Sequence, residues 1–109
     1  MATRLKSDKD FESCAERLKA VADPDRLKIV LCLFAGEKNV GQIAAEVGSE
    51  IVKVSHHLGV LRHASIVATE RQGRFVNYRL HPDVVLGKDE AGEARSIELG
   101  CCRVDLSRS

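Results

Sequence analysis

The chain of 109 residues carries four cysteines, and two of them, Cys101 and Cys102, are adjacent. Two thiolates on one short segment can bind a single soft ion. Neighbouring side chains in a regular strand point to opposite faces, so joint binding requires a kink, which Gly100 permits. A third thiol would complete a trigonal site for As(III) or Sb(III), and Cys14 is the candidate. The cysteines therefore predict a soft-metal or metalloid site at Cys14, Cys101 and Cys102.

Two other interpretations of the adjacent pair stay open. The pair could pack as small hydrophobic side chains among Leu99, Val104 and Leu106. It could also supply one thiol of a redox or persulfide switch whose other thiol is Cys14 or Cys32. Cys32 lies in an apolar stretch, where a core position is expected. Stable disulfides are not expected, because they are rare in the cytoplasm, where we place the protein.

The second chemical feature is a local excess of basic residues. The formal net charge of the chain is only +1. Between residues 51 and 81, however, five basic residues stand against one acidic residue, so this segment has a net charge of +4 and the remainder −3. All four histidines fall in the same segment. Such a cluster is the footprint of contact with nucleic-acid phosphates, although an ordinary solvated surface is the alternative.

The elements that must position these residues begin with two helices. Apolar residues at helical spacing predict an amphipathic helix over residues 10–22. Asp23 as N-cap and Pro24 at the first helical position begin a second helix that runs to about Phe34, before Gly36. Residues 27–34 are apolar apart from Lys28, which is typical of a buried central helix.

A helix-turn-helix follows. Asn39 and Gln42 have the spacing of a capping box, so Gln42 is interpreted as a cap, and Gly48 ends this third helix. After a turn over 48–50, a fourth helix begins. Its inward face is predicted to comprise Ile51, Val54, Leu58 and Leu61. Two helices joined by so short a glycine-containing turn form a helix-turn-helix.

A small β-wing is predicted next. Strands over 66–71 and 74–80 flank a two-residue turn at Gln72-Gly73, and Pro82 ends the second strand. The polar segment 87–96 is predicted to be a loop, and residues 97–106 are compatible with a strand or a helix. The predicted organisation is a flexible N-terminus over 1–9, a winged helix-turn-helix DNA-binding domain over 10–86, and a C-terminal segment over 87–109 with the cysteine pair.

The outward face of the fourth helix is the candidate DNA-reading surface. Ser55 and His56 can hydrogen-bond base edges, and Val52 can pack on a thymine methyl group. The remaining candidate DNA contacts are basic: Lys53 and Arg62 on the helix, and Arg71 and Arg74 at the wing tip. His57, beside the inward-facing Leu58, is instead expected to have a hydrogen-bonded structural role.

Four segments together resemble the ArsR/SmtB family of bacterial metal-sensing repressors. They are LKAVADPDRLKI at 18–29, VGQIA at 40–44, VSHHLGVLR at 54–62 and RQGRFVNYRL at 71–80. The resemblance implies a mostly α-helical, homodimeric winged helix-turn-helix repressor with a small β-wing, which leaves a palindromic DNA operator when an inducer binds. It implies no cofactor for DNA binding itself. Because the terminal segments of such dimers lie together, the third thiol could also be Cys14 of the partner subunit.

The chain departs from this family at the known inducer sites. Asn39-Val40-Gly41 stands where arsenic sensors of the family often carry Cys-Val-Cys. No histidine follows Pro82, although zinc sensors of the family place histidines on a last helix. Ser65 stands where a glycine is common before the wing. The inducer, if thiol-binding, must therefore use other positions.

Other classes of protein fit the sequence less well. The polar first residues and the absence of an apolar run of about 18 residues favour a soluble cytoplasmic protein without a membrane anchor. No phosphate-binding glycine loop, nucleophile elbow or paired-carboxylate motif indicates an enzyme. A winged-helix protein-interaction module without an inducer is the remaining alternative.

Overall fold

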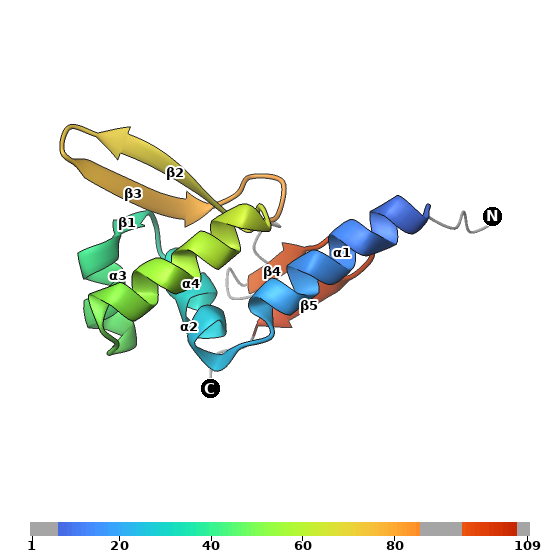
Figure 1. Ribbon diagram of the computed structural model, residues 1–109, viewed down its shortest axis with the longest axis horizontal. Helices are drawn as coiled ribbons and strands as arrows, with labels where there is room; N and C mark the ends of the chain where they lie inside the picture. Colours follow the sequence, from blue (N-terminus) through green and yellow to red (C-terminus); the bar gives the residue numbers. More distant parts are fainter. Residues whose placement is uncertain (1–6, 86–94, 107–109) are drawn as a thin grey trace.

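The computed structural model describes residues 7–85 and 95–106, and it has the predicted winged helix-turn-helix architecture (Figure 1). In these residues, four helices are interspersed with the strands of two small antiparallel sheets. In order they are α1 (Asp8–Val21), α2 (Pro24–Leu33), β1 (Lys38–Asn39), α3 (Val40–Val47), α4 (Ile51–His63), β2 (Val67–Gln72), β3 (Phe75–Leu80), β4 (Arg95–Glu98) and β5 (Arg103–Leu106). No helix in these described ranges is long and apolar enough to cross a membrane.

Local capping interactions set the ends of the first two helices. Ser7 and Asp10 form a capping box, so α1 begins at Asp8, and residues 8 and 9 of the segment predicted to be flexible are helical. Residues 1–6 of that segment lie outside the described part. Asp23 caps α2 as predicted, accepting hydrogen bonds from the backbone N–H groups of Asp25 and Arg26. The bond from the Arg26 N–H holds the pKa of Asp23 below its ordinary value.

The helix-turn-helix forms as its sequence predicts. Asn39 and Gln42 close a reciprocal capping box with two bonds of 2.9 Å, and Gly48 ends α3 at a φ of 71°. On α4, Val54, Leu58 and Leu61 are buried, but Ile51 is 54% exposed. The prediction of an inward-facing Ile51 is therefore wrong, because the first turn of α4 extends beyond the surface that buries the rest of this face.

The wing is a three-stranded sheet in the order β1-β3-β2. Gln72 pairs with Phe75, so the two-residue turn is Gly73-Arg74, one residue later than predicted. The third strand, β1, was not predicted, because two residues are too short to show a period. It pairs Lys38 with Tyr78 and so joins the helix-turn-helix to the wing.

The C-terminal segment is a hairpin of β4 and β5, which decides the strand-or-helix alternative for its described residues. The predicted loop over 87–96 is wrong at 95 and 96, which belong to β4, and its other residues lie outside the described part. The hairpin attaches to the chain after the wing through a bond of 2.7 Å from the Glu98 N–H to the Val84 carbonyl. Ile97 and Leu99 complete the core, and the hairpin lies along α1 (Figure 1).

The end of α4 has an unusual residue at its left-handed position. The N–H of Ser65 donates to the carbonyl of Arg62, and the N–H of Ile66 donates to that of Leu61, which is the Schellman pattern. Ser65 occupies the position usually taken by glycine, with a φ of 61°. Since a side chain is strained in this conformation, the junction between α4 and the wing carries a local energetic cost.

We expect Ser65→Gly to raise the free energy of unfolding by about 0.5–1 kcal/mol, because glycine relieves the left-handed strain and part of that gain is offset by its greater freedom in the unfolded chain. Denaturant unfolding followed by circular dichroism would measure this change. The matched control is Ser13→Gly, at an exposed position inside α1, which should lower stability. A destabilised Ser65→Gly variant would contradict the strain.

Candidate functional site

The outward face of α4 presents the residues predicted to read DNA. Val52 is 79% exposed, and Lys53, Ser55, His56 and Arg62 are also exposed. Ile51, displaced from its predicted core position, lies next to Val52 and adds a second apolar side chain to the first turn. A helix with its apolar side buried and this mixed polar and apolar side exposed can enter a major groove.

His57 has the structural role that its neighbourhood predicted. Its ring connects α4 to α2, with Nδ1 3.1 Å from Arg26 Nη1 and Nε2 3.6 Å from Asp25 Oδ2. Because a guanidinium only donates hydrogen bonds, Nδ1 must accept and the ring proton belongs on Nε2, facing the carboxylate. Asp23, Asp25 and His57 form a group that could geometrically hold a metal ion, but Arg26 already occupies Nδ1.

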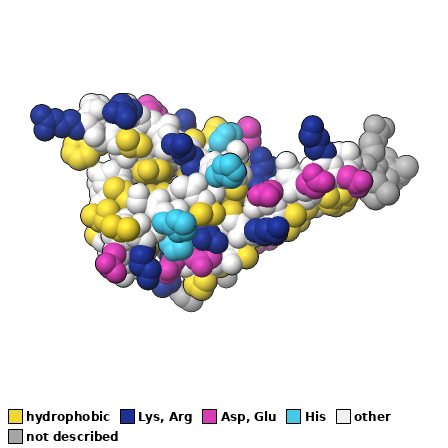
Figure 2. All heavy atoms as spheres, viewed as in Figure 1, with side chains coloured by type: hydrophobic (Ala, Val, Ile, Leu, Met, Phe, Trp, Pro, Cys, Tyr) yellow, Lys and Arg dark blue, Asp and Glu magenta, His cyan; other side chains and the backbone are white. Residues whose placement is uncertain are grey.

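The wing extends the basic surface away from α4. Arg71 and Arg74 are exposed at its tip, together with Phe75, which is 62% exposed. In Figure 2, dark-blue Lys and Arg side chains mark the end of the wing, and cyan histidines lie over and beside α4. The predicted base-reading and phosphate-binding residues are therefore on two neighbouring elements of one monomer.

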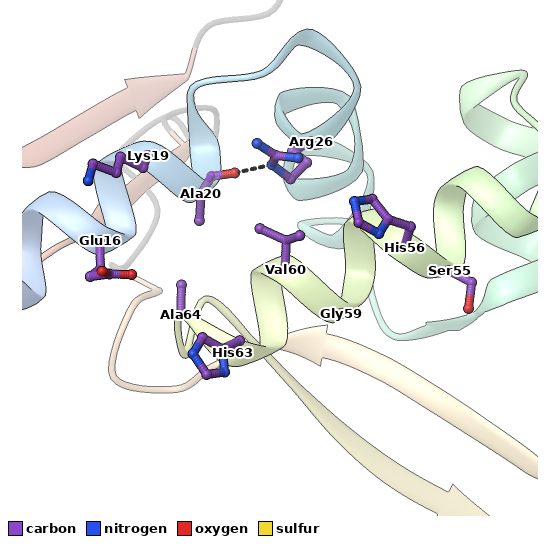
Figure 3. Close-up of a pocket in the computed structure, with 10 residues that line it drawn as sticks. All are labelled: Glu16, Lys19, Ala20, Arg26, Ser55, His56, Gly59, Val60, His63 and Ala64. Carbon is purple, nitrogen blue, oxygen red and sulfur yellow. Dashed lines mark hydrogen bonds between the residues drawn. The ribbon is translucent and has the colours of Figure 1, made fainter.

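A hollow of about 530 Å³ separates α4 from α1 (Figure 3). Small residues such as Ala20, Gly59 and Ala64 make room for it. Ser55, His56 and His63 line it from α4, and Lys19 lines it from α1. Sequence reasoning did not single out Lys19, because its place beside α4 depends on how two distant helices pack.

The three cysteines of the predicted metal site lie together within one chain. The Sγ atoms of Cys14, Cys101 and Cys102 all lie within 4.8 Å of one another, and the Cys14–Cys102 separation is 3.9 Å. Cys14 and Cys101 form a disulfide, so the expectation of free thiols is wrong for this pair. The reason is proximity: the turn after β4, with Gly100 at a φ of 107°, brings Cys101 against the buried Cys14 on α1. The kink predicted at Gly100 is thus confirmed.

The separation of Cys14 and Cys102 fits two thiolate ligands of one soft ion, and reduction of the disulfide would release Cys101 as a third. Thiolates around a tetrahedral ion with bonds of about 2.3 Å lie about 3.8 Å apart, close to the Cys14–Cys102 separation of 3.9 Å. The backbone N–H of Cys101 donates to Cys14 Sγ at 3.2 Å, an interaction that favours negative charge on that sulfur after reduction. The disulfide and a three-thiolate site exclude each other, because they use the same two sulfurs.

Cys32 is separate from this cluster. It is buried in α2, as predicted. Desolvation, with a hydrogen bond to Glu46 and the charge of that carboxylate, raises the pKa of the Cys32 thiol to about 11. The side chain is therefore a neutral thiol at physiological pH and an unreactive core residue.

Comparisons with known proteins agree with this geometry. Residues 23–69 match the family model described as bacterial regulatory protein, arsR family. Transcriptional repressor SdpR of Bacillus subtilis is 36% identical over 67 residues, which cover 62% of this chain and 74% of SdpR.

Solved structures agree as well. The transcriptional repressor BigR from Xylella fastidiosa is 37% identical, with a TM-score of 0.60 over 67% of this chain and 74% of that chain. A homodimeric winged helix-turn-helix DNA-binding domain from Mycobacterium bovis is 29% identical, with a TM-score of 0.65 over 72% of this chain and 76% of that one. The matched segment contains the helix-turn-helix and the start of the wing, and the chain thus belongs to the arsR family of bacterial regulatory proteins as a DNA-binding transcriptional repressor and not an enzyme.

Proposed function

We propose that the protein is a homodimeric cytoplasmic repressor that leaves a palindromic operator when its cysteine cluster reacts. The observation that carries this proposal is the convergence of Cys14, Cys101 and Cys102 on one point, with two of them already joined as a disulfide. Disulfides in the reducing compartment that contains bacterial DNA are usually transient or redox-sensing. A disulfide in a DNA-binding protein therefore suits a sensor.

In the proposed complex, α4 enters the major groove. Val52, Ser55 and His56 contact base edges, while Lys53 and Arg62 contact phosphates or guanines. Arg71 and Arg74 of the wing contact the adjacent minor groove or its phosphates. Lys19, at the rim of the hollow beside α4, is an added candidate for a phosphate contact.

The dimer is proposed to form through α1. Phe11 and Leu18 lie seven residues apart on this helix and are 47% and 39% exposed, an uncommon exposure for large apolar side chains. The first half of α1 projects from the body of the monomer in Figure 1, where a second copy can pack against it. A two-fold dimer would place its two α4 helices about one DNA turn apart, ~34–36 Å, and so read a palindrome.

We propose oxidation as the inducing event. Two thiols and one peroxide give the Cys14–Cys101 disulfide and two waters, so the peroxide is reduced and the sulfurs are oxidised. The bond fixes the turn of the β4–β5 hairpin to α1, the helix that we assign to the dimer interface. A change at this place alters the spacing of the two α4 helices and thus the fit to the operator.

A second inducer, As(III), is favoured by the third sulfur. Only two cysteines are needed for a disulfide, yet Cys102 lies 3.9 Å from Cys14. Arsenous acid and three thiols would give an As(III) tris-thiolate and three waters, with no change of oxidation state. This reaction requires the reduced cluster.

Removing both wing arginines tests the DNA interface. We expect the double variant Arg71→Ala, Arg74→Ala to weaken binding to duplexes selected from a random pool, because two phosphate contacts are lost. The slope of log K against log salt should become shallower by about 2. Fluorescence anisotropy at several salt concentrations measures both changes. Arg103→Ala, which removes an arginine from the C-terminal hairpin, is the charge control. An unchanged salt slope would refute the wing contact.

Oxidation should weaken operator binding of the wild-type protein by about 5–150-fold, the range of ordinary coupling free energies. Titrations of selected DNA with reduced and peroxide-treated protein would measure the ratio of dissociation constants. We expect Cys101→Ser to abolish the response and Cys32→Ser to preserve it, because the buried Cys32 thiol is unreactive. A full response in Cys101→Ser would exclude the disulfide as the switch.

Arsenite added to the reduced protein should bind at one equivalent per chain, with near-ultraviolet absorption from thiolate-to-As(III) charge transfer. The signal should be lost in Cys102→Ser and in the oxidised wild type, and kept in Cys32→Ser. Ultraviolet titration measures stoichiometry and affinity together. Equal binding by Cys102→Ser would show that the third sulfur is not a ligand.

A further inference from the structure

Arg17 lies between the sulfur cluster and α4, and sequence reasoning gave it no role. It follows Cys14 by three residues, so both side chains leave α1 on the same face. Its guanidinium is half-buried and donates hydrogen bonds to two carbonyls from distant parts of the chain. Arg17 Nη1 bonds the carbonyl of Leu99, and Arg17 Nε bonds the carbonyl of Ala64, each at 3.3 Å.

The first carbonyl belongs to the turn that carries the reactive sulfurs. Leu99 is fully buried, and its N–H donates to the carbonyl of Cys102 at 2.9 Å, which closes the turn. Gly100, the next residue, also lies against the guanidinium, since a Cβ built there would be 3.7 Å from Arg17 Nη1. The position of the Leu99 carbonyl is therefore tied to the conformation of the turn that brings Cys101 to Cys14.

The second carbonyl belongs to the DNA-reading part of the molecule. Ala64 is the C-cap of α4, where helix carbonyls have no partner within the helix. A guanidinium at this end satisfies that carbonyl and interacts favourably with the helix dipole. The next residue is the strained Ser65, and β2 of the wing begins two residues later. The bond thus reaches the joint that sets the angle between α4 and the wing.

We propose that Arg17 is the positioning residue that transmits the state of the cysteine cluster to the recognition helix; this inference rests on the proposed function. In residues 7–85 and 95–106, Arg17 is the one side chain that hydrogen-bonds both the hairpin turn and α4. Formation of the disulfide fixes Cys101 on α1 and holds the Leu99 carbonyl against Arg17. A dithiol reduces the disulfide to two thiols and is itself oxidised to a cyclic disulfide. This reduction frees the turn and alters the hydrogen bond from the Arg17 guanidinium to the Ala64 carbonyl.

A backbone route also joins the hairpin to the wing. The hairpin bonds Val84, and the N–H of His81 donates to the carbonyl of Ile66 at 2.9 Å. This route attaches β4, whereas Arg17 attaches the turn in which the sulfur chemistry takes place. Substituting Arg17 leaves the backbone route intact, so the hairpin stays attached while the proposed link is cut.

The test compares the full-length wild type with Arg17→Gln, which removes the charge and the planar guanidinium that donates to two carbonyls. The first readout is the operator dissociation constant of reduced and oxidised protein. In Arg17→Gln the ratio of the dissociation constants of the oxidised and reduced protein should fall towards 1. The reduced variant should bind the operator within about threefold of the wild-type affinity, and a thiol assay should still show disulfide formation. Arg103→Gln, with its arginine on the same hairpin, is the matched control and should keep the wild-type ratio.

The second readout is independent of DNA. Amide NMR shifts of Ser65 and Ile66 should change between reduced and oxidised wild type, and these changes should vanish in Arg17→Gln. A wild type that shows the shifts but no DNA response would refute the proposed function and leave the link standing. The link would be refuted if the amide shifts still changed on oxidation of Arg17→Gln. It would also be refuted if this variant lost operator affinity equally in the reduced and oxidised states, because Arg17 would then only cap the helix.

Arg17→Lys covers the case in which Arg17→Gln does not fold. Lysine keeps the charge, but its ammonium is a point donor that cannot bridge the two carbonyls as a planar fork does. We expect Arg17→Lys to fold and to show a lower ratio of oxidised to reduced operator dissociation constants than the wild type. A wild-type ratio in this variant would overturn the two-carbonyl mechanism.

Discussion

Val54, Leu58 and Leu61 on α4 are each at most 1% exposed, and the position of the recognition helix follows from their burial. Removing this apolar surface from water is the dominant favourable contribution to folding, and it fixes the rotation of α4 about its own axis. Once that rotation is set, the remaining side chains of the helix face outward as a group. The candidate DNA-reading surface is therefore a consequence of core packing, and none of its own residues is needed to create it.

The last carbonyl groups of α4 have no partners inside the helix, and this end is a point of contact with α1. Ala64 supplies a carbonyl with no partner within the helix, Ser65 makes the left-handed turn, and Ile66 returns the chain to the core with no exposed surface. Arg17 supplies the donor from α1. A helix end needs a partner for physical reasons, and a partner that also bonds another segment couples the two.

The C-terminal hairpin distinguishes this chain from a bare DNA-binding domain. Its two strands alone would be marginally stable. Its order depends on Ile97 and Leu99 in the core, on the bond to Val84 and on the Cys14–Cys101 disulfide, so the sulfur chemistry takes place on an element whose stability depends on that same chemistry. This dependence supports the proposed sensing role, because making or breaking one covalent bond there changes the stability of the hairpin.

The local elements of the fold were predictable from the sequence alone. The caps at Asp23 and Asn39, the left-handed Gly48 and the apolar face of α4 depend on residues within a few positions of one another, and the structure has all of them. The errors are small where the interactions are local: the wing turn is displaced by one residue, and Ile51 is exposed because it lies beyond the packed surface.

Only the tertiary structure decided the rest. The sequence identified Cys14, Cys101 and Cys102 as a group, but it left open whether Cys14 or Cys32 would pair with a C-terminal thiol. The Cys14–Cys101 disulfide joins residues that are 87 positions apart. The conformation of residues 95–106 and the role of Arg17 depend on contacts across similar separations. Hydrophobic periodicity does not predict such contacts. It determines each helix or strand locally, whereas these contacts depend on how distant elements pack together.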